Sequence, residues 1–372
     1  MPNHVAIRTD SSAAIGTGHL YRCLTLADAL RRNGASVCFI SAELTGNLSV
    51  LPERQGFEVR RLPRPEGQGG EHAQPRRQVH WTGVEWAEDA SQTRAALADT
   101  PRLDWLVVDH YAIDRRWESR LRTFAEKIMV IDDLADRPHD CDLLLDQNDL
   151  DPQGRRYAKL VPEGCRILLG PCFALLRREF IEARASLRAR DGRIGRILVF
   201  FGGSDPTNQT GKGLEAIRML GRRNFVVDVV VGEGNSHGDR IRRLCSEAGI
   251  AVFHRQAPNM AELMSKADLA IGAPGTSTWE RCFLGLPAVT LVIAENQLAV
   301  SVPVSGAGAI VNLGWHSEVR VEDIAASVGR LLDDPASVKD MASKGMELMG
   351  SGSFEGADGV AREMIGDRRA AT

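Results

Sequence analysis

The 372-residue sequence predicts two α/β domains, each a doubly wound parallel sheet covered by helices. Three observations carry this prediction. Short apolar runs alternate with helical periodicity in both halves. The chain is too long for one ordinary core and suits two domains of about 150 to 190 residues. A charged segment from Ala174 to Arg190 has the sparse apolar positions of a bridging helix. The boundary is therefore expected near Asp191 to Gly195, with domains 1–190 and 191–372.

The first half shows a strand and helix rhythm with one interruption. The expected strands are Val5–Thr9, Ser36–Ser41, Val59–Leu62, Trp105–Asp109, Ile128–Asp132 and Leu143–Asp146, with helices at Leu20–Leu30 and about Thr82–Asp99. The stretch from Pro63 to His80 is rich in Pro, Gly, Gln and Arg, which is typical of a mobile excursion. Its role as a lid or as a simple insertion stays open.

The same rhythm restarts after the boundary. The expected strands are Arg196–Phe201, Phe225–Val231, Ile250–Phe253, Asp268–Gly272 and Ala288–Val292, and the expected helices begin near Gln209, Asp239, Met260 and Thr276. Two Rossmann-like sheets facing each other across an interdomain cleft describe the GT-B architecture of nucleotide-sugar enzymes. In such sheets ligands bind at the carboxyl ends of the strands.

Composition narrows the possible partners. The chain is 43% apolar and 26% charged with a net charge of −3, so electrostatics give no reason to expect a nucleic-acid partner. The N-terminus lacks a signal-peptide pattern, and the apolar run Ala288–Ala294 is too short to span a membrane. We expect a cytoplasmic monomer without membrane insertion. The seven cysteines include no C-x-x-C pair and are expected to be reduced packing residues, Cys23 and Cys282 among them.

The first motif joins a strand, a glycine turn and a helix near the N-terminus. Gly16, Thr17 and Gly18 follow the first predicted strand and precede an apolar helical pattern. Glycines let backbone N–H groups approach an anion closely, and the helix N-terminus adds positive potential, so this turn is predicted to hold a phosphate group. His19 at the same turn is the predicted catalytic residue, because an imidazole that titrates near neutrality can accept a proton from water.

Two turns of the second half repeat this plan. Gly203 and Ser204 follow the strand Arg196–Phe201 and are predicted to bind substrate, although a tight turn with Thr207 or Asn208 capping a helix explains them equally well.

The second of these turns carries the predicted nucleotide site. Gly275, Thr276 and Ser277 precede a helix, and their backbone amides are predicted to hold a diphosphate. Glu280, one turn further, is predicted to bind a ribose diol, with a capping box on Ser277 as the alternative.

Other acidic residues compete for a role in acid–base chemistry. Asp10 ends the first strand and is a second catalytic candidate, either as the base or as the residue that orients His19; a turn carboxylate that accepts backbone hydrogen bonds is the alternative. Asp132 and Asp133 end another strand, and paired carboxylates act in sugar hydrolases. His110 is the other histidine at a strand end. No His-x-x-x-His or Asp-x-Asp pattern indicates a metal site.

Several motifs, in order, resemble one known family. They are Arg8-Thr9-Asp10-Ser11-Ser12, the run from Ile15 to Leu24, Val108-Asp109-His110-Tyr111, Ile131-Asp132-Asp133, the run from Phe173 to Arg177, Gly202-Gly203-Ser204-Asp205 and Glu295-Asn296-Gln297. Together they resemble the PseG family over roughly residues 4 to 310. These enzymes hydrolyse UDP-2,4-diacetamido-2,4,6-trideoxy-β-L-altropyranose in pseudaminic acid synthesis.

The resemblance implies a fold related to MurG and a metal-independent, inverting hydrolysis of a UDP-sugar by water, without a cofactor. It places the catalytic histidine at His19, Tyr111 and Arg177 near the sugar or diphosphate, Glu280 near the ribose and Asn296 against the nucleotide-sugar. The excursion from Pro63 is longer than the compact family members need.

Two other function classes remain. A glycosyltransferase on the same scaffold would pass the sugar to an acceptor, and a non-catalytic nucleotide-sugar binding protein or sensor would keep the fold without the chemistry.

Overall fold

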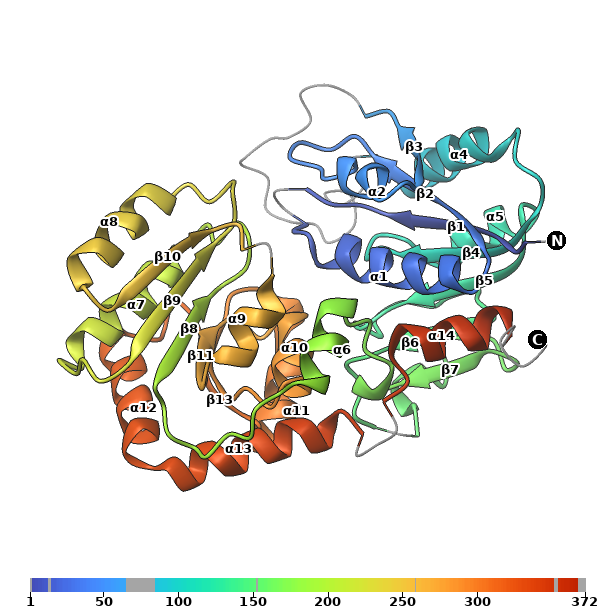
Figure 1. Ribbon diagram of the computed structural model, residues 1–372. Helices are drawn as coiled ribbons and strands as arrows, with labels where there is room; N and C mark the ends of the chain where they lie inside the picture. The colour runs from blue at the N-terminus through green and yellow to red at the C-terminus, as the bar shows by residue number, and fades with distance from the viewer. Residues whose placement is uncertain are drawn as a thin grey trace. The chain divides into compact units, whose positions relative to one another are not determined.

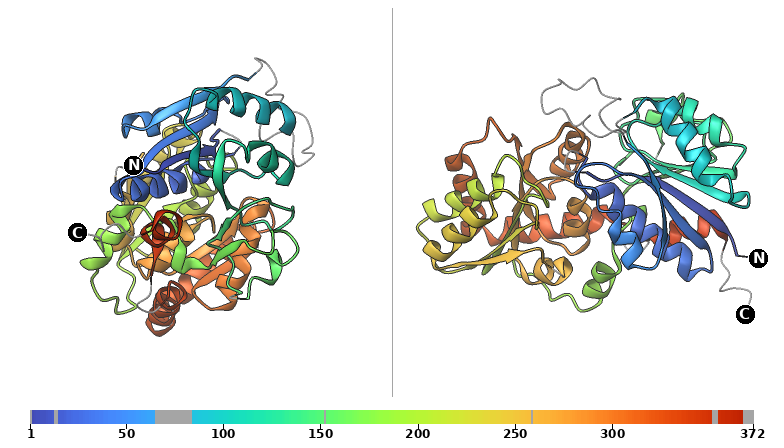
Figure 2. Two further views of the ribbon diagram at one scale, coloured as in Figure 1. Left: turned by 90° about the vertical axis from the view of Figure 1, so that its right-hand side faces the viewer. Right: turned by 90° about the horizontal axis from the view of Figure 1, so that it is seen from above.

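A computed structural model describes residues 2–12, 15–64, 84–151, 153–257, 259–350 and 354–366 (Figure 1). The chain divides into two compact units. The first unit is Met1–Leu175 together with Glu355–Thr372, and the second is Leu176–Phe354. Each unit is built around one parallel sheet, with helices on both faces that can be followed in Figure 1 and Figure 2.

The sheet of the first unit has seven parallel strands. Their order is β3 (Glu58–Leu62), β2 (Ser36–Ala42), β1 (His4–Thr9), β4 (Leu103–Asp109), β5 (Ala125–Ile131), β6 (Leu143–Asp146) and β7 (Arg166–Leu169). The direction of winding reverses between β1 and β4, where Thr9 pairs with Asp109. In doubly wound sheets the ligand crevice lies outside the carboxyl ends of the strands at such a reversal.

Helices α1 (Gly18–Arg32) and α14 (Gly356–Ile365) pack on one face of this sheet, and α4 (Trp86–Leu97) and α5 (Arg115–Leu121) pack on the other. Short helices complete the unit: α2 (Val50–Arg54), η1 (Arg155–Tyr157) and η2 (Pro171–Phe173). Alternation along β1 serves both faces, since Val5 and Ile7 contact the α1 side and Ala6 the α4 side. The Nε1–H of Trp105 donates to the carbonyl of Met364 at 2.8 Å, which ties α14 to the sheet.

The second unit contains six parallel strands. Their order is β10 (Ala251–Arg255), β9 (Val226–Val231), β8 (Arg196–Phe200), β11 (Leu269–Gly272), β12 (Ala288–Val292) and β13 (Ile310–Trp315). Its helices are α6 (Arg178–Ala185), α7 (Gln209–Met219), α8 (Gly238–Ala248), α9 (Met260–Lys266), α10 (Ser277–Phe283), η3 (Glu295–Gln297), α11 (Leu298–Gly306), α12 (Val321–Asp333) and α13 (Pro335–Leu348). Winding reverses between β8 and β11, so two loops after these strands meet at the expected crevice position.

The predicted strands of both halves are confirmed within a few residues, but β7 and β13 were not predicted. Both lie at a sheet edge, and both lack the continuous apolar run that marks a buried strand: β7 begins at an exposed Arg166, and β13 includes Asn312 and Gly314. Helix α4 begins at Trp86 rather than near Thr82. Most of the excursion, from residue 65 to His80, lies outside the described residues.

The division into units differs from the predicted boundary at Asp191 to Gly195. The units divide after Leu175, because α6 buries Phe180 completely and packs against α9 and α10 of the second unit. The segment after Phe354 belongs to the first unit, because Val360 and Ala361 of α14 are fully buried against the α1 side of its sheet. The packing of α14 against the first unit joins segments from the two ends of the chain. Such a long-range contact cannot be predicted from the periodicity of apolar residues.

A buried ionic cluster fixes the connection that follows β5. His139 Nδ1 lies 2.7 Å from Oε1 of Glu118 on α5, and its Nε2 lies 3.8 Å from Oδ2 of Asp132. The hydroxyl of Tyr157 donates to the same Asp132 oxygen at 3.2 Å. Burial alone would lower the pKa of His139, but its bonds to Asp132 and Glu118 raise that pKa to about 9. The cluster therefore holds the loop that carries Asp133.

We expect this cluster to make unfolding pH-dependent. The pKa of His139 rises from 6.5 to about 9 on folding, so its contribution is complete below pH 6.5 and is lost as the pH rises through 9. The loss is on the order of 2 to 3 kcal/mol. Chemical denaturation at about pH 6 and about pH 10 measures it. His139→Asn should lack this part of the pH dependence, and His254→Asn is the control. An unchanged pH dependence in His139→Asn contradicts the expectation.

Candidate functional site

The reversal in the first sheet brings His19 and Asp109 together. His19 lies in the first turn of α1, directly after the glycine turn that follows β1, and Asp109 is the last residue of β4. Nδ1 of His19 is 2.6 Å from Oδ1 of Asp109. The ring of Tyr111 meets the imidazole edge to face, with 4.5 Å between ring centroids. His19 and Tyr111, which the sequence analysis predicted as site residues, therefore lie next to one another, and His19 also contacts Asp109.

The partner at Nδ1 decides the tautomer of His19. Asp109 is fully buried, and burial alone would raise the pKa of its carboxyl; the charges of Arg22 and His19 instead hold that pKa well below its usual range. An ionised carboxylate can only accept, so Nδ1–H of His19 donates to Asp109 and the lone pair lies on Nε2. The His19 side chain keeps 9% exposure. This arrangement suits an imidazole that accepts a proton at Nε2.

Arg22 connects this pair to the next strand. Its Nε and Nη2 donate to the two oxygens of Asp109, both at 2.6 Å, and its Nη1 donates to Oδ2 of Asp133 at 3.1 Å. The side-chain amide of Asn148 donates to the same Asp133 oxygen at 3.1 Å. The thiol of Cys23 donates to Asp109 at 3.3 Å. The carboxyl ends of β4 and β5 are thereby joined through one guanidinium.

The glycine turn before α1 has features of an anion-binding helix N-terminus. Gly16 has a φ of 81°, which favours glycine, and its N–H donates to the carbonyl of Ser12 at 2.9 Å. Helix α1 begins at Gly18 with Thr17 at the N-cap, without a side-chain cap and without an acidic residue in its first turn. An anion is the complement that such a helix end favours.

Asp10 occupies a second buried ionic network. Its carboxylate accepts from Nη2 of Arg8 at 2.9 Å and from the backbone N–H of Ala42 at 2.7 Å, and it lies 3.2 Å from Nε2 of His110. Burial alone would raise the pKa of Asp10, but Arg8 and His110 hold it far below its usual range. Because Nδ1 of His19 is bonded to Asp109, the ring is oriented by Asp109. A catalytic role for Asp10 stays a prediction.

The pair Asp132 and Asp133 is divided between two networks. Asp132 lies 2.9 Å from Nη1 of Arg137 and accepts from Tyr157, whereas Asp133 accepts from Arg22. Each carboxylate has its own cation. The geometry therefore favours structural ion pairs over a shared acid–base pair.

In the second unit, the turn after β8 is closed by side-chain caps. Asp205 accepts from the N–H groups of Gln209 and Thr210, each at 2.8 Å, and Asn208 accepts from Gly211 at 3.3 Å. The first N–H groups of α7 are thus bonded to a carboxylate, as in the capping alternative for this turn, with Asn208 as the N-cap. Gly203 and Ser204 are exposed beside the caps, and their binding to substrate stays a prediction.

The turn after β11 lies beside the turn after β12. A Cβ added at Gly275 would lie 3.7 Å from Nε2 of Gln297, and Gln297 accepts from the N–H of Ile293 at 2.9 Å. Asn296 is exposed next to it on η3. Thr276 and Ser277 begin α10, which has no side-chain cap. The structure therefore places Gly275 and Asn296 at one edge of the sheet, and their binding to a nucleotide stays a prediction.

Glu280 and Arg177 form an ion pair. Nη2 of Arg177 donates to Oε1 of Glu280 at 3.0 Å, and the Glu280 side chain keeps 12% exposure. Because α10 has no side-chain cap, the capping-box alternative for Glu280 is not the observed arrangement. The two residues were predicted separately, and the structure places them together.

Arg281 was missed by the sequence analysis. It is 2% exposed, and its Nη2 donates to the carbonyl of Ala273 at 3.0 Å and to the hydroxyl of Thr278 at 3.2 Å. Burial lowers the pKa of Arg281 to about 10, against the smaller opposing effects of Cys282 and Glu280. The turn from Ala273 to Ser277 therefore lies over a buried cation whose hydrogen bonds go to a carbonyl and to hydroxyl groups.

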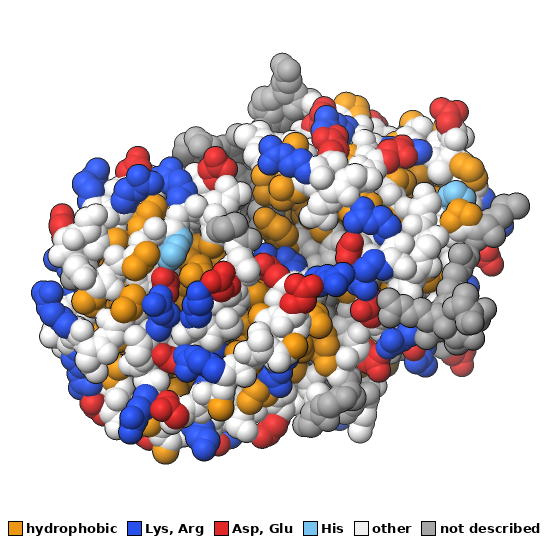
Figure 3. All heavy atoms as spheres, in the orientation of Figure 1, with side chains coloured by type: hydrophobic (Ala, Val, Ile, Leu, Met, Phe, Trp, Pro, Cys, Tyr) orange, Lys and Arg blue, Asp and Glu red, His pale blue; other side chains and the backbone are white. Residues whose placement is uncertain are grey.

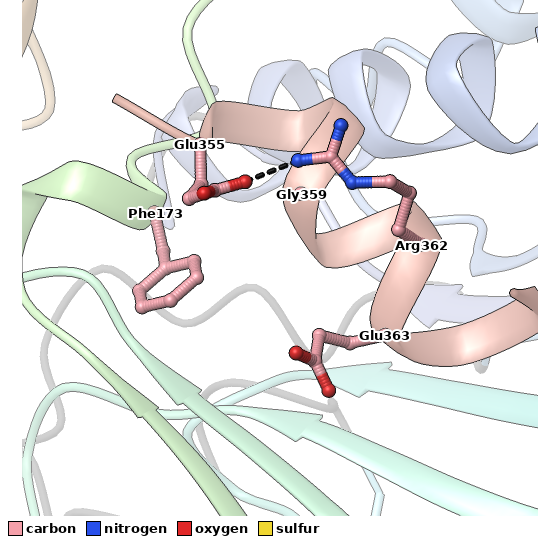
Figure 4. A pocket seen from close by; sticks show the side chains of 5 residues that line it. All are labelled: Phe173, Glu355, Gly359, Arg362 and Glu363. Atoms are coloured by element: carbon pink, nitrogen blue, oxygen red, sulfur yellow. Dashed lines mark hydrogen bonds and ion pairs between the residues drawn. The ribbon is translucent and has the colours of Figure 1, made fainter. Parts of the chain in front are cut away.

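The first unit also has a pocket of about 480 Å³ beside α14, away from the predicted site residues (Figure 4). It is lined by Phe173, Glu355, Gly359, Arg362 and Glu363. Arg362 pairs with Glu355, and Glu363 pairs with Arg166. These charged groups already have partners, so we assign no ligand to the pocket.

The described ranges of residues give three observations, which concern metal ions, membrane-spanning helices and surface charge. No group of three or more His, Cys, Asp or Glu side chains there is placed to hold a metal ion. Membrane crossing would need a longer and more apolar helix than any found in those ranges. On the face drawn in Figure 3, positive and negative side chains are interspersed.

The fold matches solved glycosyltransferases over nearly the whole chain. MurG from Acinetobacter baumannii superposes with a TM-score of 0.64 at 14% identity, covering 98% of this chain and 99% of that one. UGT89C1 from Arabidopsis thaliana, complexed with UDP, gives 0.68 at 16% identity, with 97% and 99% covered. The chain has the GT-B fold. This confirms the predicted fold class of two parallel-sheet α/β domains.

Sequence comparisons point in the same direction. The Glycosyltransferase family 28 C-terminal domain matches residues 197–351. The uncharacterized protein MJ1062 of Methanocaldococcus jannaschii is 26% identical over 79% of this chain, which spans 56% of that relative's length.

Two further relatives are covered almost completely. The spore coat polysaccharide biosynthesis protein SpsG of Bacillus subtilis is 25% identical over 88% of this chain and 89% of its own. The UDP-2,4-diacetamido-2,4,6-trideoxy-β-L-altropyranose hydrolase of Campylobacter jejuni is 23% identical over 79% and 93%. At 23–26% identity these proteins are distant relatives of this chain.

We expect Cys23 to be inert in the folded chain. Burial and the charge of Asp109 raise the pKa of this thiol well above its ordinary value, whereas the half-exposed Cys165 has its pKa lowered by its bond to Cys141. Iodoacetamide at about pH 8 should alkylate Cys165 at least about tenfold faster than Cys23, and urea should remove the difference. Peptide mass mapping measures both rates. Fast native alkylation of Cys23 contradicts the described geometry.

Proposed function

We propose that the chain hydrolyses a UDP-linked diacetamido-trideoxy sugar, UDP-2,4-diacetamido-2,4,6-trideoxy-β-L-altropyranose, to UDP and the free sugar, as a step of pseudaminic acid synthesis. The observation that carries the proposal is the His19–Asp109 pair at the reversal of the first sheet, with Nδ1 and Oδ1 at 2.6 Å. The similarity to the Campylobacter jejuni hydrolase supports the substrate class.

The base activates water. Nε2 of His19 takes a proton as the water oxygen attacks the anomeric carbon, and Asp109 stabilises the imidazolium that forms. The bond between the anomeric carbon and the diphosphate oxygen breaks, and UDP leaves with the bonding electrons. Attack from the face opposite UDP inverts the anomeric centre. Tyr111, packed on the imidazole, limits the room for the sugar beside it.

The leaving group needs charge stabilisation rather than a proton, because a diphosphate is already acidic. The backbone amides of Thr17 and Gly18 at the start of α1 are proposed for this task, whereas the N–H of Gly16 is bonded to the carbonyl of Ser12 and shapes the turn. The proposed reaction is therefore metal-independent, and a chelator should leave its rate unchanged.

The second unit is proposed to take up the UDP group. Gly275, Thr276 and Ser277 would hold the diphosphate above the buried Arg281, and Glu280, paired with Arg177, would bind the ribose diol. Asn296, Gly203 and Ser204 are exposed at the same edge of the sheet for further contacts with the nucleotide-sugar. Arg177 pairs with Glu179 at 2.7 Å as well as with Glu280 at 3.0 Å, so one guanidinium is shared by two carboxylates.

A glycosyltransferase is the second candidate, because residues 197–351 match the Glycosyltransferase family 28 C-terminal domain. His19 would then deprotonate an acceptor hydroxyl in place of water. Proton NMR of the purified chain with the UDP-sugar and no acceptor separates the two. A hydrolase releases UDP and free sugar, whereas a transferase leaves the donor intact.

We expect His19→Ala to abolish turnover. Loss of general base catalysis should lower kcat by about 100-fold or more, while UDP affinity changes little, because the contacts proposed for the uridine and ribose lie in the second unit. Asp109→Asn should also lower kcat, since the wrong tautomer is favoured. His254→Ala, on the edge strand β10, where His254 pairs with Asp228, is the control. Near wild-type turnover by His19→Ala, measured by UDP release, would falsify the proposed mechanism.

We expect Arg281 to contribute to diphosphate binding by its charge. Calorimetric titration of Arg281→Met with UDP and with uridine should show about tenfold weaker UDP binding and unchanged uridine binding. Arg281→Lys, which keeps the charge, should lie between them and serves if the methionine variant does not fold. Equal losses for UDP and uridine would instead assign Arg281 to the folding of the turn.

A further inference from the structure

Arg22 is the residue of the Gly18-His19-Leu20-Tyr21-Arg22-Cys23 motif to which the proposed mechanism gives no role. Its side chain is 4% exposed. It lies three residues after His19 on α1, so both side chains share one face of the helix. Nη2 of Arg22 lies 3.2 Å from Nδ1 of His19 and donates to Asp109 at 2.6 Å. One guanidinium therefore contacts both His19 and Asp109.

Asp109 and Arg22 place opposite charges beside the His19 ring. A buried carboxylate 2.6 Å from Nδ1 attracts the protonated imidazole. An imidazolium has no lone pair on Nε2 and cannot accept a proton from water. The carboxylate of Asp109 that orients the His19 ring thus also favours the protonated ring, which cannot act as a base. A second charge of opposite sign, equally close to Asp109 and near the ring, opposes that attraction at comparable distance.

We propose that Arg22 is a positioning residue that offsets the charge of Asp109, so that His19 is held by the carboxylate and can still act as a base. The bidentate contact to Asp109, through Nε and Nη2, fixes the guanidinium in the plane of the carboxylate. Its kinetic consequence rests on the proposed function, whereas its effect on the imidazole does not.

Asp133 holds the other end of Arg22. Oδ2 of Asp133 accepts from Nη1 of Arg22 and from Nδ2 of Asn148, both at 3.1 Å. These bonds prevent the guanidinium from turning away from Asp109. A lysine could not make the two-pronged contact and reach Asp133 at once, because an ammonium group is a single point charge.

Several titratable groups among the described residues lie near His19. Asp109 faces it from β4, and Arg22 and the thiol of Cys23 come from α1. Asp146, at the end of β6, borders Asp133; burial and the charge of Asp133 raise the pKa of Asp146 to about 7.

Asp146 has its own partners. It accepts from Tyr157 at 2.9 Å and lies 3.3 Å from Arg156. The pair of Asp10 and His110 follows β1 and β4 and forms a separate network with Arg8.

The first test needs no substrate. NMR titration of the ¹⁵N-labelled His19 ring in the full chain should show its midpoint about one pH unit or more higher in Arg22→Met than in wild type. Arg22→Lys, which keeps the charge, should shift it by less than half of that. Arg31→Met, an exposed arginine on the same helix, is the control and should leave it unchanged. An unshifted midpoint in Arg22→Met overturns the inference.

The second test is kinetic. In Arg22→Met the acid limb of the kcat pH profile for UDP-sugar hydrolysis should move to higher pH, with activity lost about tenfold near pH 7 and regained on the alkaline side, while KM stays within about twofold. Arg22→Lys should restore most of the profile. Equal losses in both variants at every pH indicate a purely structural role and overturn the inference.

The two proposals fail differently. If His19→Ala retains turnover, the proposed function is wrong, and the NMR titration still decides the role of Arg22. If His19→Ala abolishes turnover and Arg22→Met shifts neither the imidazole titration nor the acid limb, the Arg22 inference alone is wrong. Should Arg22→Met not fold, Asp133→Asn and Arg22→Lys provide the comparison, since loosening Arg22 by removing its Asp133 anchor should move the midpoint in the same direction.

Discussion

The buried carboxylate of Asp109 is the constraint on which the first unit's site depends. It ends the β4 strand at the reversal of the sheet, where it is fully buried. Burial of a charge is costly unless it is paired and hydrogen-bonded. Asp109 therefore requires Arg22, His19 and Cys23 around it, all from the first two turns of α1. The position of that helix and the tautomer of its histidine follow from this requirement.

The second unit contains a buried charge of the opposite sign, Arg281. Arg281 is buried beneath the turn that follows β11, and its described contacts are a carbonyl and hydroxyl groups rather than a carboxylate. A cation in this state is stabilised when an anion binds nearby. The first unit thus has a paired buried anion beside His19, and the second has a buried cation with hydrogen bonds to neutral groups, at the turn proposed to hold a diphosphate. Both lie at the winding reversal of a parallel sheet, which is where such sheets bind ligands.

Local signals in the sequence predicted much of this arrangement. The strand, glycine turn and helix around His19 follow from residues adjacent in the chain, and the strand ending at Asp109 follows from its apolar run. Arg22 could have been predicted as a neighbour of His19 from the helical spacing of three residues. Its bond to Asp133 could not, because it depends on which strands are adjacent in the sheet. The caps by Asp205 depend on a positive φ at that residue, which the sequence does not reveal. The return of α14 to the first unit likewise depends on packing between distant segments.

The most direct test of the account is the tautomer of His19. ¹⁵N NMR of the full chain, recorded on the alkaline side of the His19 titration, distinguishes the protonated from the unprotonated ring nitrogen. The account predicts a proton on Nδ1, bonded to Asp109, and a lone pair on Nε2, with Asp109→Asn losing this preference. A His19 ring protonated on Nε2 in the wild-type chain would contradict the account, because the nitrogen that must accept the proton from water would already carry one.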